Sequence, residues 1–204
     1  MKDLPIYLAS VDEEGTGMFV VSLVSDPAVE VSWQLFEKAQ ELFKVENPDK
    51  QLITGVVMLA DTPIYRYDPE YGEYYIKYTK DTIAKMVQKY FKENNQENVD
   101  QEHSFELIDG IELQQAFIKD TEKGINPAGF ENVPDGSLFF TYKVTSDELW
   151  EQVKNGSWTG FSLAGVFDIK QAFSKHDDVD ETDAEEEEIL QLIEKLRGRI
   201  FKEQ

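Results

Sequence analysis

Two residues, Ser162 and His103, have the side chains that a serine hydrolase needs for acyl transfer. Ser162 lies in the segment SWTGFSLAGVF, residues 157–167, between Gly160 and Gly165. A hydroxyl is a weak nucleophile by itself, so it needs a base within hydrogen-bond reach. His103, in VDQEHSFE, could be that base, because a free imidazole titrates near neutrality and can take a proton from a serine.

The two glycines beside Ser162 suit the same chemistry. Gly160 and Gly165 would let a substrate backbone approach, and they could free backbone N–H groups for an oxyanion hole. The segment is not the G-x-S-x-G elbow of α/β-hydrolases, because its second glycine comes one residue late. The residues alone therefore leave open whether Ser162 is a nucleophile or only a hydroxyl in a strand, and whether His103 is incidental.

The composition limits the other classes of function. A chain of 204 residues with 41% hydrophobic residues suits one domain with appendages, and zero cysteines exclude disulfides and thiolate metal sites. The net charge of −21 would repel phosphates, so we expect no direct nucleic acid binding. No apolar run reaches the ~18 residues of a membrane span, and the N-terminus lacks signal-peptide features, so we expect no membrane association and a cytoplasmic location. Neither metal-ligand spacing nor a nucleotide-binding loop is present, and we expect no cofactor.

The elements that must position the two residues follow an α+β pattern. Strand chemistry occurs at residues 17–29, 53–66, 73–79, 111–120, 136–145 and 158–169, with the turn YDPEYGE between the second and third of these segments. Helical spacing occurs at residues 32–45, 79–95 and 145–156. Thr145 and Glu148 fit a capping box for the last helix, and Gly156 fits its stop position.

The C-terminal part of the chain has a different composition. We expect a domain over residues 1–172, an acidic disordered linker over 173–188 and an amphipathic helix over 189–204. The helix has a narrow apolar stripe, formed by Ile189, Ile193, Leu196 and Ile200. The stripe could dock on a partner protein or pack on the domain itself.

An ordered series of segments resembles a known family. The segments are VSLVSDPAVEVSW, ITGVVMLADTPIYRYD, GEYYIKYTKDTIAKMVQKYFKENNQENVDQEH, IDGIELQQAFI, NPAGFENVPDGSLFFTYKV and DELWEQVKNGSWTGFSLAGVF. Over residues 15–170 the chain resembles phage prohead (capsid maturation) serine proteases of the XkdF type, which are related to HK97-type prohead proteases and herpesvirus assemblin.

The resemblance implies a fold and a function. It implies a mainly antiparallel, β-barrel-like sheet flanked by helices, as in assemblin. It implies a serine endopeptidase that cuts phage scaffold and major capsid proteins, and itself, inside the assembling prohead in the host cytoplasm. By position, Ser162 matches the family's nucleophile and His103 its base. A homo-oligomer is possible, and VSLVSDPAV resembles a segment that follows the serine in HK97-type relatives, which suggests a circularly permuted order.

The chain departs from the family where acids are expected. Relatives often have an acid two residues after the serine, where this chain has Ala164, and an acid before S-L-V, where it has Val20 and Val21. Relatives also read E-S where this chain has Gln115 and Ala116.

The third member of a triad is therefore unassigned, with four candidates, Glu102, Glu106, Asp109 and His176. A neighbouring carboxylate would raise the pKa of His103, so we expect activity to fall on the acid side at or above the ordinary histidine value. Two other readings stay open. The chain could be a catalytically inactive capsid-assembly or scaffold-associated protein that retains the protease fold, or an unrelated acidic binding module.

Overall fold

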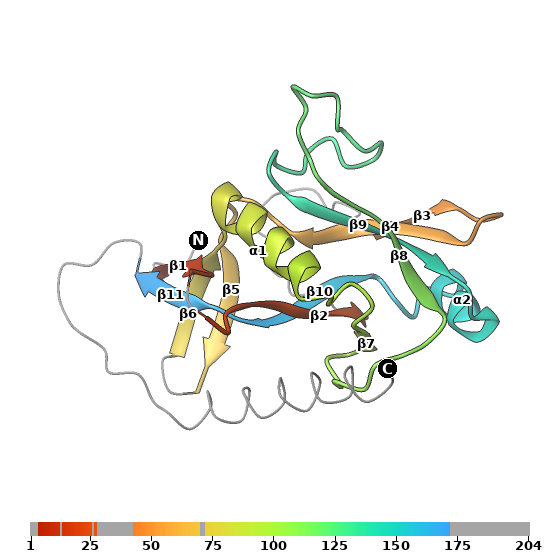
Figure 1. Ribbon diagram of the computed structural model, residues 1–204, viewed down its shortest axis with the longest axis horizontal. Helices are drawn as coiled ribbons and strands as arrows, with labels where there is room; N and C mark the ends of the chain where they lie inside the picture. The colour runs from red at the N-terminus through yellow and green to blue at the C-terminus, as the bar shows by residue number, and fades with distance from the viewer. Residues whose placement is uncertain (1–3, 13, 26, 28–42, 70–71, 172–204) are drawn as a thin grey trace. The chain divides into compact units, whose positions relative to one another are not determined.

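The computed structural model describes residues 4–12, 14–25, 27, 43–69 and 72–171, and these contain eleven strands and two helices (Figure 1). Contacts divide the chain into two units, Met1–Phe173 and Ser174–Gln204. The expected acidic linker and C-terminal helix lie outside the described residues. The elements are β1 (Ile6–Ser10), β2 (Gly17–Val24), β3 (Phe43–Asn47), β4 (Leu52–Met58), β5 (Ile64–Asp68), β6 (Gly72–Lys77), α1 (Lys80–Lys92), β7 (Val99–Gln101), β8 (Ile111–Ile118), β9 (Leu138–Val144), α2 (Asp147–Lys154), β10 (Gly160–Val166) and β11 (Asp168–Gln171).

The strands of the described part form three sheets. Their orders are β11-β1-β6-β5, β10-β2-β7 and β3-β4-β9-β8. Most neighbours are antiparallel, while β1–β6 and β2–β7 are parallel. The expected α+β class and the mainly antiparallel pairing are confirmed, but the described strands form open sheets rather than a closed barrel.

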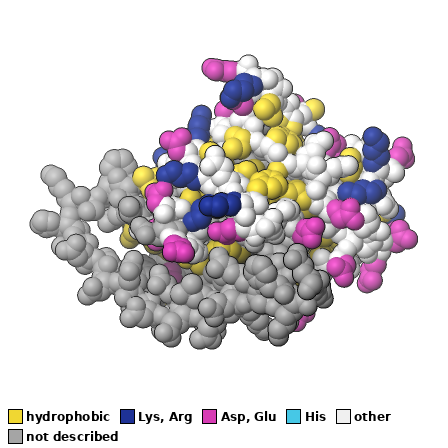
Figure 2. Space-filling model, in the orientation of Figure 1, with side chains coloured by type: hydrophobic (Ala, Val, Ile, Leu, Met, Phe, Trp, Pro, Cys, Tyr) yellow, Lys and Arg dark blue, Asp and Glu magenta, His cyan; other side chains and the backbone are white. Residues whose placement is uncertain are grey.

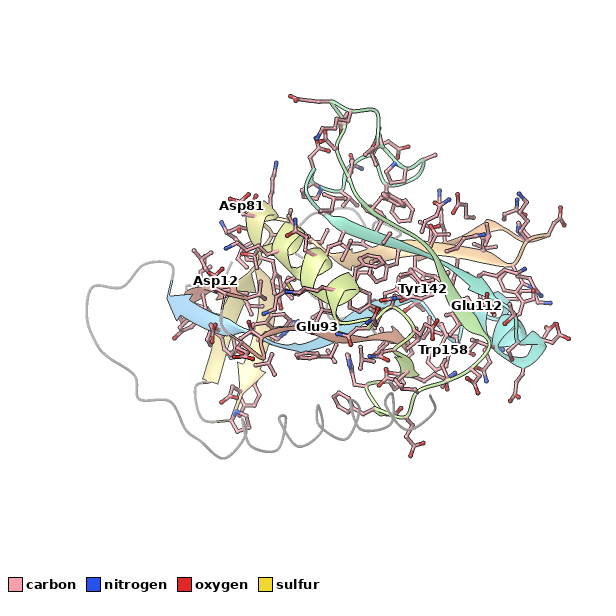
Figure 3. All side chains as sticks on the ribbon, viewed as in Figure 1. Asp12, Asp81, Glu93, Glu112, Tyr142 and Trp158 are labelled. Carbon is pink, nitrogen blue, oxygen red and sulfur yellow. The ribbon has the colours of Figure 1, made fainter. Side chains whose placement is uncertain are left out.

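The hydrophobic core lies on one face of the β10-β2-β7 sheet. Phe161 of β10 contacts Phe43 and Tyr142 with ring centroids 5.1 and 5.3 Å apart. Tyr142, labelled in Figure 3, also contacts Phe140. Helix α1 covers this core with its buried residue Tyr90, and it lies next to β2 in Figure 1. The opposite face of β10 and β2 therefore lies outside this core.

The two helices begin where side chains cap their free backbone N–H groups. Thr79 accepts a hydrogen bond from Thr82 N at the start of α1. The predicted cap of α2 was one residue early, because Ser146, not Thr145, accepts from Leu149 N. The predicted stop is confirmed, since Gly156 has φ +78° directly after the cap residue Asn155.

Some predicted boundaries were wrong. The segment 53–66 is two strands, β4 and β5, rather than one. Its second half pairs with β6 across the predicted turn, as Tyr65 pairs with Tyr75. Most of the helix predicted over 32–45 lies outside the described residues, but its last three residues belong to β3, because Phe43 faces the core from a strand paired with Gly55.

No helix in the described ranges is long and apolar enough to cross a membrane.

A buried lysine organises the segment between β8 and β9. Lys119 is 2% exposed, and its Nζ donates to the carbonyls of Phe130, Glu131 and Val133 at 3.1, 2.8 and 2.6 Å. We expect Lys119→Met to lower the free energy of unfolding by about 3 kcal/mol or more, because it removes three hydrogen bonds from a charged donor. Phe130 O keeps a bond from Val133 N, but the buried carbonyl of Val133 loses its bond from Lys119. Chemical denaturation measures this.

The matched control is Lys123→Met. Lys123 forms an exposed ion pair with Asp120, so we expect a much smaller change. Equal stability of the two variants would show that Lys119 does not hold this segment in place.

Candidate active site

Three polar side chains form a row across the sheet β10-β2-β7. Ser162 of β10 pairs with Ser22 of β2, and Ser22 pairs with Asp100 of β7. Residues paired in register point to the same face of a sheet, so the three side chains lie side by side. Because Phe161 and Leu23 point into the core, the row is on the opposite face. Ser162 is 7% exposed, and Ser22 and Asp100 are fully buried.

His103 lies in a tight turn directly after β7. Its φ is +55°, and the φ values of Glu102 and Phe105 are +51° and +56°. Non-glycine residues in this left-handed region are strained, and such strain gathers at functional sites. The turn is held by Asp100 Oδ2, which accepts from Phe105 N at 2.7 Å, and by Leu23 O, which accepts from Glu102 N at 3.0 Å. The sheet therefore fixes the position of the imidazole.

The turn brings His103 onto both serines of the row. Nε2 lies 2.9 Å from Ser162 Oγ, although the two residues are 59 positions apart in the sequence. Nδ1 lies 3.0 Å from Ser22 Oγ. The residue itself is exposed, but its two ring nitrogens both face buried or nearly buried hydroxyls. The structure thus brings together the two residues that the sequence selected, and it adds Ser22.

Partial burial of the ring controls the basicity of His103. Desolvation lowers its pKa below the ordinary value of 6.5, and the guanidinium of Arg66 acts in the same direction. The carboxylates of Asp100 and Glu102 act in the opposite direction but do not outweigh the burial. The expectation of a raised pKa was therefore wrong, because it considered nearby charge and not desolvation.

The arrangement can transfer a proton from Ser162. In the tautomer with hydrogen on Nδ1, that group donates to Ser22 Oγ, and Nε2 is free to accept from the Ser162 hydroxyl. A neutral imidazole in this tautomer is the form that a general base requires. The geometry is that of a nucleophile, a base and a group that orients the base.

The acids that the sequence offered for the third position do not bond to His103. Glu102 Oε1 accepts from Ser25 N at 2.8 Å, which ties the turn to the end of β2. Within the described part of the chain, Glu106 and Asp109 form no hydrogen bond with the ring, and His176 lies outside the described residues. Sequence reasoning missed Ser22, although the segment VSLVSDPAV that contains it carried part of the family resemblance.

Both glycines of β10 pack against the protein itself. A Cβ added to Gly160 would lie 2.6 Å from Pro27 Cγ, and one added to Gly165 would lie 2.1 Å from Gly17 O. The structure therefore gives these glycines a packing role, and the expectation that they leave space for a substrate is not supported. Gly165 follows a register shift in the pairing of β10 with β2.

A separate cavity of about 300 Å³ lies on the sheet β3-β4-β9-β8. Lys44, Thr54, Gln115 and Thr141 line it, and none of the row residues does. Within the described ranges, no three histidine, aspartate or glutamate side chains form a group that could hold a metal ion. The candidate active site is therefore His103 together with the row of Ser162, Ser22 and Asp100.

Comparisons with known proteins find a family model and individual relatives that match the chain. A family model described as "Putative phage serine protease XkdF" matches residues 38–171, which include His103 and Ser162 but not Ser22. In Bacillus subtilis (strain 168), the "Phage-like element PBSX protein XkdF" is 30% identical over 135 residues, which are 66% of this chain and 44% of that protein.

A second relative from Bacillus subtilis (strain 168), "Uncharacterized protein YqbD", is 26% identical over 148 residues, which are 72% of this chain and 41% of that protein. This chain thus spans less than half the length of either relative. No solved structure matches it. The chain belongs to the phage family described as "Putative phage serine protease XkdF".

Proposed function

We propose that the chain is a serine endopeptidase of phage head maturation, with Ser162 as nucleophile and His103 as general base. The observation that carries the proposal is the 2.9 Å contact between Ser162 Oγ and His103 Nε2. The second contact of the same ring, with Ser22, supports it because a catalytic histidine needs a fixed orientation and tautomer. Membership of a family described as serine proteases supports the same reaction.

The reaction follows from the positions of the two groups. Ser162 Oγ attacks the scissile carbonyl while its proton moves to His103 Nε2. The imidazolium then gives this proton to the leaving amine, which departs and leaves an ester on Ser162. Water, deprotonated by the same ring, hydrolyses the ester and restores the serine.

The phage family suggests the substrates and the place. Scaffold and major capsid proteins, and the chain itself, would be cut inside the prohead in the host cytoplasm, by a protein that binds neither nucleic acid nor membrane directly. The relation to assemblin and a homo-oligomeric state belong to the same proposal. The face shown in Figure 2 carries both acidic and basic side chains, so its acids do not form one continuous patch there.

Co-expression with the cognate scaffold and capsid proteins tests the proposal. We expect mass spectrometry to find defined new termini in these proteins with the natural chain and intact proteins with Ser162→Ala. Identical termini with both chains would contradict the proposal.

A second candidate is an inactive assembly protein that retains the fold. It is favoured by one observation, that no carboxylate among the described residues bonds to His103. Unprocessed scaffold and capsid proteins, together with normal shells that require the chain, would support this candidate in the same experiment.

The lowered pKa of His103 predicts a specific pH dependence. Only the neutral imidazole can accept the serine proton, and a pKa below 6.5 keeps the ring neutral to lower pH. We expect the midpoint of the acid-side fall in activity to lie below about pH 6.5, the ordinary histidine value. The pH profile of kcat/KM measures this midpoint, and a midpoint above pH ~6.5 would contradict the lowered pKa of His103.

A further inference from the structure

One of the two carboxylate oxygens of Asp100 takes no part in holding the turn. Oδ2 accepts from Phe105 N, but Oδ1 is buried and has no hydrogen-bond partner among the described residues. Asp100 is fully buried, and a buried carboxylate oxygen without a donor is costly. The hydrogen bond to the turn explains Oδ2 but not the burial of Oδ1.

Ser22 is the neighbour of Asp100 across the sheet, and it also contacts the imidazole. It is the register partner of Asp100 in the parallel pair β2–β7, and its hydroxyl contacts His103 Nδ1. A hydroxyl has one hydrogen and two lone pairs, so it can accept from one neighbour and donate to another. If Ser22 donates toward Asp100, it must accept from His103, and Nδ1 must then carry hydrogen.

We propose that Asp100 is the acid of this active site and that it acts on His103 through the hydroxyl of Ser22. The carboxylate attracts the hydroxyl hydrogen of Ser22, so that Ser22 Oγ presents a lone pair to His103 Nδ1–H. This selects the tautomer in which Nε2 can accept the proton of Ser162. Ser22 and Asp100 are thus positioning residues, and the contacts run from Ser162 to His103, from His103 to Ser22, and from Ser22 toward Asp100.

The electrostatics of the site agree with this order. Asp100 is the carboxylate that acts most strongly on the pKa of His103, ahead of Glu102, and both raise it. Arg66 is the cation that opposes them. The negative charge of Asp100 also stabilises the imidazolium that forms when Ser162 attacks. The inference rests on the proposed function for its consequence in catalysis, but the tautomer of His103 is a property of the resting protein.

The test uses Asp100→Asn in the full chain. The amide oxygen can still accept from Phe105 N, while the amide nitrogen donates toward Ser22. Ser22 then donates to His103 Nδ1, and the ring holds its hydrogen on Nε2 instead. We expect ¹⁵N NMR of labelled histidine to show this exchange of the protonated nitrogen, which is readable because the chain has two histidines. We expect labelling of Ser162 by a fluorophosphonate probe to slow by about 10²- to 10⁴-fold.

The matched control is Asp109→Asn, the same chemical change at an exposed residue that is close to His103 in the sequence. It should leave both the tautomer and the labelling rate unchanged. The residual reaction of Asp100→Asn should begin to fall at lower pH than that of the natural chain, because a charge that raises the pKa of His103 is gone. An effect on folding alone would not move this profile.

Ser22→Ala gives an independent test if Asp100→Asn does not fold. Without the hydroxyl, His103 Nδ1 loses its partner, and we expect mixed tautomers and slower labelling. Unchanged tautomer and rate in either folded variant would overturn the inference. If the natural chain shows the Nδ1–H tautomer but Ser162 is never labelled, the proposed protease function fails while the role of Asp100 in selecting the tautomer stands.

Discussion

Replacement of Ser162 by alanine is expected to reduce the rate of proteolysis by about 10⁴-fold or more while the melting temperature changes little. The nucleophile is lost, and what remains is the catalysis that binding and polarisation of the substrate provide. The fold should persist, because the change removes one hydroxyl on the face of β10 opposite the core and leaves Phe161 in the core. Quantitative mass spectrometry of fragments, beside thermal unfolding, measures both quantities.

Two further variants show whether the pair acts as a unit. His103→Ala should cost nearly as much activity as Ser162→Ala, and the double variant should be hardly worse than either. Ser157→Ala is the matched control, since that exposed hydroxyl bonds only to the side chain of Asn155 near the end of α2. If the loss of activity in the double variant equalled the product of the losses in Ser162→Ala and His103→Ala, this would contradict a proton transfer between the two residues.

Gly165→Ala is expected to lower the free energy of unfolding by about 2–4 kcal/mol. The new Cβ would lie 2.1 Å from Gly17 O and 2.8 Å from Phe167 Cζ, so β10 must move away from β2. At a site with room, the same change would stabilise by restricting the unfolded chain. Because Ser162 pairs with Ser22 in this same ladder, the reactivity of Ser162 should fall as well.

Gly15→Ala serves as the control for this prediction. No atom of the described residues lies within 4 Å of its added Cβ, although its φ of +88° makes alanine mildly unfavourable. We expect a loss of about 1 kcal/mol there, visible in chemical denaturation. If Gly165→Ala lowered the free energy of unfolding no more than Gly15→Ala, β10 and β2 would not be packed closely at Gly165.

Local patterns in the sequence predicted the elements that depend on local interactions. The helix α1 follows from apolar spacing that places Ile83, Met86 and Tyr90 in the core. The same reasoning could not locate β7, because its three residues are too few to show an alternation of apolar and polar residues. Nor could it give the order of the sheets, which depends on pairings between distant segments such as β2 and β10.

The candidate site was predictable only in part, for the same reason. The family resemblance selected His103 and Ser162, and the structure places them in contact, while their catalytic roles stay predictions. The sequence predicted the orienting group among Glu102, Glu106, Asp109 and His176. The sheet instead supplies Ser22, 81 positions away, because β2 runs between β10 and β7. Asp100 was available three residues before His103, but only the register reveals that it faces Ser22.

The central claim, that His103 activates Ser162, is tested most directly by labelling the full chain with a fluorophosphonate probe and locating the adduct by peptide mass spectrometry. We predict a single adduct on Ser162 that is absent from Ser162→Ala, strongly slowed in His103→Ala and unchanged in Ser157→Ala. An adduct on another serine, or labelling of Ser162 at the same rate with and without His103, would contradict the claim.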